Sequence, residues 1–471
     1  MNKKKAYFIG IAGKTMGALA KALKGLGWKV SGSDHQGIYP PMSIYLQKNK
    51  IPYVEGYAAE NVPEDVDLVV VGRSALMVDI KNPEYFKAKS LGIPVLSHPE
   101  ALENYVIKDN SIVVAGTYGK TTISALIAWI LLKDGKDPSY MTSGISLDLK
   151  DGVKITNSKF SVVEGDEPPS LFPNDPPKFM FYKPKYLLLT ATHWDHPEIY
   201  KSEEAYRQAF VNLVKLLPQD GLLVYNLDNV DQKVTTEARC RKISYSLNNH
   251  RADYFIKNAS PKESGTKIEL NKNLRKLETL LLGKANLENI CGAVALCLEI
   301  GIPKNSVELA VKSFRGIKTR LEFLGRFSRR YFYWDIAQHP QKVKGSLEAL
   351  KERYQNSRLV CVFDPAMTGL KYKETLKWYS GAFDLANLVI VGKVGYLRDL
   401  TGEGRISGAD IVKAISQTQK KVFYQPINEK IFQYLTKETK SGDIIVFMSS
   451  GGLRFADLIK KVVDYFKLSA D

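Results

Sequence analysis

The chain has 471 residues, too many for one hydrophobic core, and this length suggests about three domains. Hydrophobic residues make up 44% and charged residues 25%, which is typical of a globular protein and excludes a mainly disordered chain. The 67 Lys and Arg against 50 Asp and Glu give a net charge of +17, which fits a solvated basic surface or anionic small-molecule ligands; the basic residues form no clustered arm, so nucleic acid is not expected as a partner.

The N-terminal region begins with a predicted strand at residues 6–12, which runs into a glycine-rich turn and a helix at 18–26. The turn contains Gly10, Gly13, Met16 and Gly17. A second strand at 28–31 ends in Ser33 and Asp34, where the acidic residue of a Rossmann fold would meet a ribose. The turn fits a nucleotide-like ligand, and a turn that serves packing alone is the alternative.

Two more strands, at 67–72 and 93–97, continue the alternation of strands and helices. This alternation predicts a small, doubly wound α/β domain. We place the end of the first domain at residue 107.

The strongest motif of the chain lies at residues 111–131. It reads as a short apolar strand, a glycine-bracketed turn and an apolar helix that begins at Lys120. The turn comprises Gly116, Thr117, Tyr118, Gly119, Lys120, Thr121 and Thr122. Backbone N–H groups, a lysine and hydroxyls therefore meet at the positive end of a helix dipole, where a polyphosphate and its Mg²⁺ bind. The glycines stand closer together than in the common P-loop, so the general pattern fits only in part.

Two later strands end in groups that suit a metal. The strand at 160–163 leads into Glu164, Asp166 and Glu167, and the strand at 186–190 leads into His193, Asp195 and His196. Carboxylates and imidazoles beside a phosphate loop are what bridging of phosphates by Mg²⁺ or Mn²⁺ requires. Taken singly, an acidic tip is more often a solvated turn and a histidine more often a structural residue. Their joint occurrence after Lys120 favours a nucleotide and metal site.

A basic stretch and a helix close the central region. Residues 267–276 are predicted as a surface turn and residues 281–300 as a helix. Asn286 and Asn289 lie one turn apart on that helix. They either read an adenine edge or cap the helix.

The third domain is placed from residue 314, because residues 313–320 are basic and turn-like. Its strands are predicted at residues 331–335, 359–363, 388–391 and 444–448, with helices between them. This region is again α/β.

Cysteine usage and apolar runs indicate a cytoplasmic protein. The four cysteines form no C-x-x-C pair, which predicts reduced and mostly buried thiols; they are Cys240, Cys291, Cys297 and Cys361. Glycines and Lys14 break the apolar run after the basic start, so no signal peptide is predicted. Lys120 interrupts the other long apolar stretch, so membrane insertion is not expected.

Four segments resemble the Mur ligases, a family of ATP-dependent enzymes that form amide bonds in peptidoglycan synthesis. They are GSDHQGIYPPMS at 32–43, GTYGKTT at 116–122, KFMFYKPKYLLLTATHWDH at 178–196 and FMSSGGL at 447–453. The Y-P-P-M-S run resembles the branch of murein peptide ligases in cell-wall recycling. The other segments are shared in part with the L-alanine-adding branch.

The resemblance implies a fold of three α/β domains over essentially the whole chain. An N-terminal Rossmann-like domain at 1–107 would bind the UDP substrate, and a central P-loop ATPase-like domain at 108–313 would bind ATP. A C-terminal Rossmann-like domain at 314–471 would bind the amine or peptide. Domain closure is expected, since Arg320 and Asp335 must reach an ATP whose phosphates lie on another domain. We expect a monomer or weak dimer.

The resemblance also implies ligands and their residues. ATP and Mg²⁺ (or Mn²⁺) would be the cofactors, and UDP-N-acetylmuramate with a cell-wall peptide or amino acid the substrates. The catalytic residues would be Lys120, Glu164, His196 and Arg320, and the metal ligands Thr121, Glu164 and His196. ATP would contact Gly116, Thr117, Gly119, Lys120, Thr121, Thr122, Asn286, Asn289, Arg320, Asp335 and His339. The UDP part would contact Gly10, Gly13, Met16, Gly17, Ser33 and Asp34.

The sequence departs from the family pattern at several positions. Tyr118 replaces the histidine of the phosphate loop, and Gln338 replaces the first histidine of the D-Y-A-H-H-P motif. Ala366 stands where recycling ligases carry an arginine, and a methyl group does not replace a bidentate guanidinium. No lysine follows His196 at the distance of a carbamylated metal bridge, which the recycling and alanine-adding branches are expected to lack.

Three functions therefore stay open. They are a murein-peptide-type ligase, an L-alanine-adding or related ligase, and a paralogue that binds ATP and a UDP-sugar without ligating. Survival of Lys120, Glu164, His196 and Arg320 favours an enzyme. A dehydrogenase reading of the N-terminal turn leaves the second domain unexplained.

Overall fold

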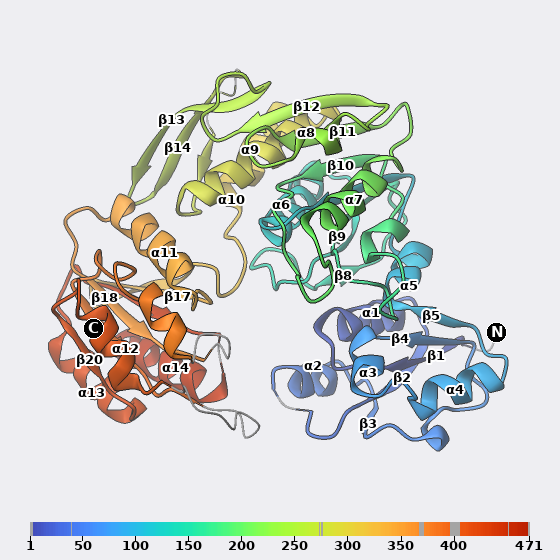
Figure 1. Cartoon of the computed structure of the whole chain (residues 1–471), viewed down its shortest axis with the longest axis horizontal. Helices are drawn as coiled ribbons and strands as arrows, with labels where there is room; N and C mark the ends of the chain where they lie inside the picture. The colour runs from blue at the N-terminus through green and yellow to red at the C-terminus, as the bar shows by residue number, and fades with distance from the viewer. Residues whose placement is uncertain are drawn as a thin grey trace. The chain divides into compact units, whose positions relative to one another are not determined.

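The computed structural model describes residues 3–38, 40–272, 274, 277–366, 372–395, 406–450 and 452–469 (Figure 1). These residues form two compact units. The first comprises Met1–Ala259, Ile268–Thr279 and Glu288–Phe314, and the second comprises Ser260–Lys267, Leu280–Leu287 and Arg315–Asp471. The boundary predicted after residue 107 lies inside the first unit, so the domain limits stay predictions.

The N-terminal part of the first unit is a parallel sheet with the order β3-β2-β1-β4-β5. Its strands are β1 (Lys5–Ile9), β2 (Lys29–Asp34), β3 (Tyr53–Glu55), β4 (Leu68–Val71) and β5 (Val95–Ser97). The helices are α1 (Lys14–Gly25), α2 (Met42–Lys48), α3 (Arg73–Val78), α4 (Pro83–Ser90) and α5 (His98–Tyr105), with a 3₁₀ turn η1 (Ala59–Asn61). The strand order reverses beside β1, which is the switch point of a doubly wound fold. The predicted α/β class is therefore confirmed, and the glycine turn lies at the switch point.

The second sheet has the order β15-β14-β13-β12-β11-β10-β6-β9-β7-β8. At its centre, β6 (Asn110–Ala115) pairs in parallel with β9 (Phe160–Gly165) and β10 (Tyr186–Leu189). The other strands are β7 (Ser139–Met141), β8 (Val153–Lys154), β11 (Leu222–Asn226), β12 (Arg241–Ser246), β13 (Tyr254–Lys262), β14 (Gly265–Leu270) and β15 (Glu278–Thr279). The helices are α6 (Lys120–Lys133), α7 (Glu203–Val214), α8 (Gln232–Thr235), α9 (Lys284–Glu299) and α10 (Lys304–Ser313), with a 3₁₀ turn η2 (Lys178–Phe181). Helix α6 is buried over most of its surface, which explains why its sequence has no polar face.

The surface turn predicted at 267–276 is wrong in its first part, because β14 continues to Leu270. Thr266, Ile268 and Leu270 are buried, whereas Lys267 and Glu269 are exposed. This alternation with a period of two is that of a strand with one solvated face. The charged residues of the outer face concealed it.

The sheet of the second unit has the order β16-β17-β21-β18-β19-β20. Its strands are β16 (Glu322–Phe327), β17 (Arg330–Asp335), β18 (Leu359–Phe363), β19 (Leu388–Val391), β20 (Val422–Tyr424) and β21 (Ile444–Met448). The helical elements are α11 (Pro340–Arg353), η4 (Lys373–Trp378), α12 (Gly408–Ile415), α13 (Asn428–Glu438) and α14 (Leu453–Leu468). All four predicted strands are confirmed, and β16 and β20 are additional. Along β18 the side chains alternate between two hydrophobic cores, one on each face of the sheet, so the strand reads as a continuous apolar run.

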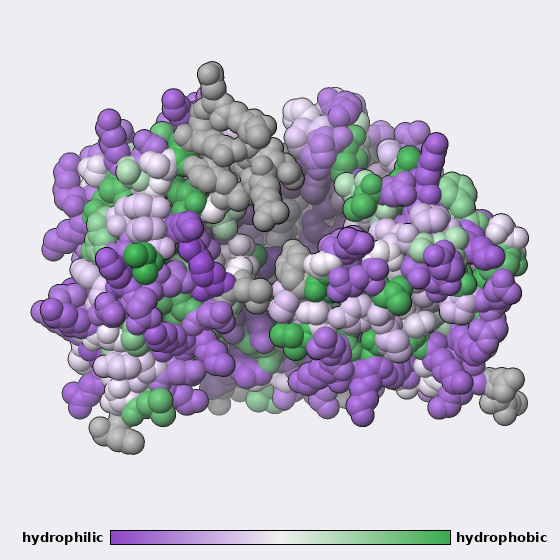
Figure 2. All heavy atoms as spheres, turned by 90° about the horizontal axis from the view of Figure 1, so that it is seen from below, coloured by the Kyte–Doolittle hydropathy of each residue, from purple (hydrophilic) through white to green (hydrophobic). Residues whose placement is uncertain are grey.

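The remaining general expectations concern cysteines and membranes. All four cysteines are free and buried, which confirms that prediction. No helix in the described part of the chain is both long and apolar enough to cross a bilayer. On the face shown in Figure 2, hydrophilic residues cover most of the coloured surface and apolar residues form small, separated patches.

Candidate functional site

The phosphate loop is fixed to the end of β10. Gly116 has φ +122°, and a Cβ on it would lie 2.4 Å from Thr190 Oγ1 and 2.7 Å from the Ala191 carbonyl oxygen. The Thr117 N–H donates to the same Ala191 carbonyl at 3.1 Å, and the Thr190 hydroxyl donates to the carbonyl of Tyr118. Only glycine allows both this φ and this approach, so the loop has one shape.

Helix α6 begins at Lys120, directly after Gly119. Within the described residues, no side chain caps this helix, so the positive end of its dipole faces outward without a carboxylate cap. This is the arrangement that binds a phosphate at a helix N-terminus. The predicted order of strand, turn and helix is confirmed.

Lys120 forms a buried ion pair with Glu167. Its Nζ donates to Glu167 Oε1 at 2.8 Å, to Oε2 at 3.0 Å and to the Gly116 carbonyl at 2.7 Å. Glu167 is 2% exposed. Burial raises the pKa of the Glu167 carboxyl, and the Lys120 ammonium acts against that rise. Glu167 is absent from the predicted site residues, although it belongs to the acidic tip noted after β9.

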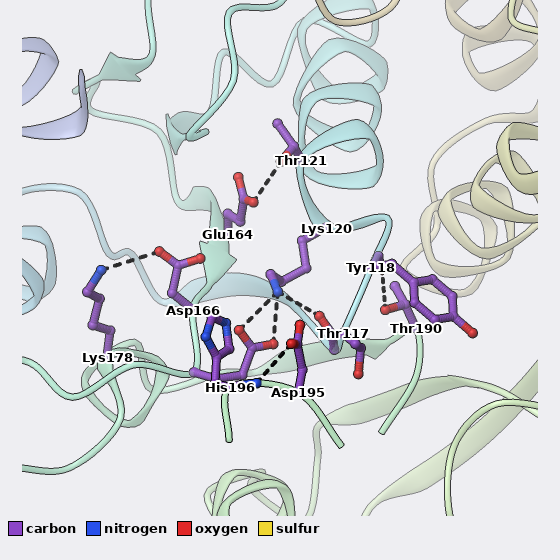
Figure 3. Close-up of polar contacts among 12 residues, drawn as sticks. Thr117, Tyr118, Lys120, Thr121, Glu164, Asp166, Lys178, Thr190, Asp195 and His196 are labelled. Carbon is purple, nitrogen blue, oxygen red and sulfur yellow. Dashed lines mark hydrogen bonds and ion pairs between the residues drawn. The ribbon is translucent and has the colours of Figure 1, made fainter. Parts of the chain in front are cut away.

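Thr121 and Glu164 are brought together as predicted. The Thr121 hydroxyl donates to Glu164 Oε1 at 2.7 Å (Figure 3). Ser143 donates to Oε2 through its N–H at 2.9 Å and its hydroxyl at 2.8 Å. Burial and then the neighbouring Asp166 raise the pKa of Glu164, while its hydrogen bonds oppose the rise. Ser143 carries no motif signal and could not have been found from the sequence.

Hydroxyl and carboxylate oxygens are the ligands that Mg²⁺ prefers. No group of three or more His, Cys, Asp and Glu side chains in the described residues could hold a metal. The chain therefore offers part of a coordination shell, and Mg²⁺ usually completes its shell with water and substrate phosphates. Thr121 and Glu164 fit such an ion.

His196 contacts its own loop. Its Nδ1 lies 2.9 Å from Glu198 Oε1, and its backbone N–H donates to Asp195 at 2.8 Å. The residue has φ +57°, and its side chain is 35% exposed. Its predicted part in metal binding therefore stays a prediction.

The two asparagines of α9 have different environments. Asn289 Oδ1 would lie only 2.5 Å from a Cβ on Gly119, so its amide packs directly on the phosphate loop. Asn286 donates from Nδ2 to the Leu282 carbonyl at 2.8 Å. Asn289 thus lies against the phosphate loop, whereas Asn286 bonds to backbone beside its own helix, and their contact with a nucleotide stays a prediction.

Tyr118, the residue that departs from the family pattern, stacks on His193. Their ring centroids are 5.9 Å apart with an interplanar angle of 30°, and Tyr118 is 44% exposed. Burial and then Glu288 raise the pKa of Tyr118 to about 12. The residue adds an aromatic surface beside the loop.

The N-terminal glycine turn is held by its own neighbours. The N–H groups of Gly10 and Ile11 both donate to the Ser33 carbonyl at 2.9 Å, and the Ala12 N–H donates to Asp34 Oδ2 at 2.6 Å. Asp34 is 5% exposed, and Tyr57 and the His35 N–H also donate to it. Gly10, Met16, Gly17 and Ser33 are buried too, and Gly13 is partly exposed. Ser33 and Asp34 therefore shape the turn, and their contact with a UDP group stays a prediction.

In the second unit, Asp335 ends β17 and is 6% exposed. It accepts hydrogen bonds from the Ser346 hydroxyl and from the Ala337 N–H. Burial raises the pKa of Asp335, while these hydrogen bonds and the charge of Arg320 oppose the rise. Arg320 therefore lies close enough to Asp335 to act on its charge, and the nucleotide role of both residues stays a prediction.

The rest of the D-I-A-Q-H-P segment starts a helix. His339 caps α11 by accepting from the Gln341 N–H at 3.3 Å, and its ring lies 5.5 Å from that of Trp378. Gln338 is 6% exposed, and among the described residues its Nε2 has no partner. Ala366 donates its N–H to the Asp364 carbonyl at 2.9 Å. Met367, Thr368 and Gly369, which follow Ala366, lie outside the described residues, as do Tyr39 and Gly451 of the predicted motifs.

Family models match three parts of the chain. They are described as the Mur ligase family catalytic domain at residues 5–108, the Mur ligase middle domain at 175–297 and the Mur ligase glutamate ligase domain at 319–451. The chain is 30% identical over 456 residues to the UDP-N-acetylmuramate–L-alanine ligase of Acetivibrio thermocellus, which covers 95% of this chain and 93% of that protein.

A second relative represents the other branch. The chain is 27% identical over 464 residues to the UDP-N-acetylmuramate–L-alanyl-γ-D-glutamyl-meso-2,6-diaminoheptandioate ligase of Escherichia coli, which covers 97% of each protein. Among solved structures, the UDP-N-acetylmuramate–alanine ligase of Thermotoga maritima has a TM-score of 0.77 at 23% identity and covers 99% of each chain. The murein peptide ligase of Psychrobacter arcticus has a TM-score of 0.63 at 23% identity and covers 98% of this chain and 99% of that one.

Proposed function

The chain belongs to the Mur ligase family, whose members are ATP-dependent ligases that form amide bonds, and on this premise we propose that it joins the carboxylate of UDP-N-acetylmuramate to an amine. The observation that carries the proposal is the pair of contacts at the start of α6. Lys120 meets Glu167, and Thr121 meets Glu164, directly after a glycine loop. A lysine, a hydroxyl and buried carboxylates at one helix N-terminus suit a triphosphate that is to be cleaved.

In the proposed reaction, the muramoyl carboxylate attacks the γ-phosphorus of ATP. This step gives an acyl phosphate and releases ADP. The amine then attacks the acyl carbon, loses a proton and displaces inorganic phosphate. Lys120 offsets charge on the transferring phosphoryl group, and Thr121 and Glu164 would hold the Mg²⁺ that lowers the remaining charge.

We propose that the amine is a cell-wall peptide of the L-alanyl-γ-D-glutamyl-meso-diaminopimelate type. The Y-P-P-M-S run within residues 32–43 supports it, since this run resembles the recycling branch. L-Alanine is the second candidate, because the relative at 30% identity is named for it and the position at Ala366 lacks the arginine of recycling ligases.

Both candidate amines are tested by measuring phosphate release from ATP in the presence of UDP-N-acetylmuramate and a panel of amines. Release with the peptide supports the first candidate. Release with free L-alanine alone selects the second. Absence of release with every amine, despite nucleotide binding, would leave a paralogue that binds without ligating and would overturn the proposed activity.

A further inference from the structure

Lys178 lies next to Asp166, one of the three carboxylates at the end of β9. It begins η2, and its backbone N–H donates to the Pro168 carbonyl at 3.0 Å. The next N–H, of Phe179, donates to the Asp166 carbonyl at 3.3 Å. These bonds fix Lys178 beside the tip of β9 that carries Glu164 and Glu167.

Within the described part of the chain, the ammonium group of Lys178 has one weak polar contact. Its Nζ lies 3.5 Å from Asp166 Oδ2, and the two side chains are 22% and 32% exposed (Figure 3). Asp166 is in turn close enough to Glu164 and Glu167 to raise the pKa of both. A lysine has three N–H donors, so one contact at this length leaves it able to bind an anion.

Helix α5, which begins at His98, packs on η2, which begins at Lys178. His98 is 6% exposed, and its ring bonds to the backbone of Thr15 in the first turn of α1. Burial and then the charge of Lys178 lower the pKa of His98 to about 3, so the ring is neutral. Its Nε2 is buried and has no partner among the described residues. A series of neighbouring residues therefore links the glycine turn to the phosphate site. Its members are Thr15, His98, Lys178 and Asp166.

We propose that Lys178 binds the carboxylate of the sugar-nucleotide substrate and holds it for attack on the γ-phosphate. The proposal rests on the proposed function, since it names the group that receives the reacting carboxylate. Carboxylate and triphosphate repel each other, and Glu164, Asp166 and Glu167 add negative charge on the phosphate side. An ammonium between the sugar-nucleotide side and the phosphate side lowers that repulsion and fixes the nucleophile. Lys178 supplies such an ammonium beside Asp166.

The test compares two ligands by calorimetry with the full chain and without ATP. UDP-N-acetylmuramate carries the carboxylate on its lactyl group, and UDP-N-acetylglucosamine is the same sugar nucleotide without that lactyl group. The wild-type chain is expected to prefer the first ligand. Lys178→Ala and Lys178→Gln are each expected to bind UDP-N-acetylmuramate about tenfold more weakly, the size of one charge-assisted hydrogen bond, and UDP-N-acetylglucosamine unchanged.

The controls separate this inference from a general defect. Lys178→Arg keeps the charge and is expected to retain part of the preference. Lys185→Ala removes an exposed lysine of the same segment that pairs with Asp220, and it is expected to change neither affinity. Equal affinities of wild type and Lys178→Gln for UDP-N-acetylmuramate, or an equal loss for both ligands, would overturn the role of Lys178. A wild-type chain that binds neither ligand would overturn the proposed function, and this inference with it.

Discussion

The two glycine turns of the first unit share a backbone design and differ in how they use acids. Both connect a parallel strand to a helix, and neither helix has a side-chain cap within the described residues. Gly10 has φ +84° and Gly119 has φ +83°. At the first turn, Asp34 accepts from the N–H of Ala12, so the acid fixes the backbone. At the second, Glu167 accepts from the side chain of Lys120.

The first acid therefore fixes the backbone of its turn, whereas the second acid pairs with a lysine that can change its partner. A backbone N–H held by a buried carboxylate is already satisfied. A lysine held by a carboxylate can exchange that partner for a phosphate, because its side chain is flexible and has three donors. The backbone of the N-terminal turn is therefore fixed by Asp34, whereas the ammonium of Lys120 in the second loop could exchange Glu167 for an anionic ligand.

The largest expected effect is on Lys120. Lys120→Ala is expected to lower phosphate release by about 10³-fold or more, because a cation at the transferring phosphoryl group is lost. The melting temperature should change little by comparison. Lys133→Ala, in the last turn of the same helix, is the control and should keep activity. Near-normal turnover of Lys120→Ala would refute the loop as the phosphate site.

Glu167→Gln tests whether the loop holds an exchangeable charge. Removal of one partner of a buried ion pair leaves the other uncompensated, so the free energy of unfolding should fall by about 3 kcal/mol without nucleotide. ATP with Mg²⁺ should then raise the melting temperature of Glu167→Gln more than that of the wild type, because phosphates replace the lost carboxylate. Asp220→Asn, in an exposed ion pair, is the control. Equal shifts on nucleotide addition would contradict the exchange.

A glycine pair compares the two turns directly. An alanine at a positive φ costs about 1 kcal/mol, which is the loss expected for Gly10→Ala because its nearest atom would be 3.5 Å away. Gly119→Ala should lose about 2 kcal/mol or more, since its Cβ would lie 2.5 Å from Asn289 Oδ1. Urea denaturation measures both. The same small loss at both sites would show that Asn289 does not press on the loop.

The smallest expected effect is the pH dependence of stability that His98, beside the N-terminal turn, causes. Its pKa is about 3 when folded against 6.5 as reference, so below pH 6.5 the unfolded chain binds a proton that the folded chain does not. Titration of His98 therefore lowers the free energy of unfolding as pH falls, by about 1 kcal/mol between pH 6 and pH 5. The difference in unfolding free energy between wild type and His98→Gln should shift by that amount. A difference that stays constant with pH would mean that His98 is not buried as a neutral ring.

Prediction of the fold succeeded where the pattern is local. Strands such as β18 and β21 are apolar runs between turn residues, and they were placed correctly. β16 was missed because it is half-exposed and irregular, with a register shift between Phe323 and Gly325. β14 was missed because charges on its outer face suggested a turn.

Prediction of the local structure around the candidate site succeeded for residues inside one motif, whereas contacts between residues far apart in the chain were harder to predict. The loop from Gly116 to Thr122 could be read locally, because its glycines, lysine and hydroxyls are consecutive. The contact between Thr121 and Glu164 was expected from family resemblance, and the pairing of Lys120 with Glu167 was not predicted. That pairing depends on the parallel register of β6 and β9, which brings Ala115 beside Gly165.

The sequence by itself determined the α/β class and the strand-turn-helix order around residues 116–122, because periodicity and turn chemistry act over a few residues, and its motifs showed the resemblance to the Mur ligases. Only the tertiary structure decided what each acid does. Asp34 accepts from the N–H of Ala12, Glu167 holds Lys120, and Asp166 lies 3.5 Å from the ammonium of Lys178. The physical reason is that an acid's role depends on burial and on which donors reach it, and both are set by strands that meet at one edge of a sheet.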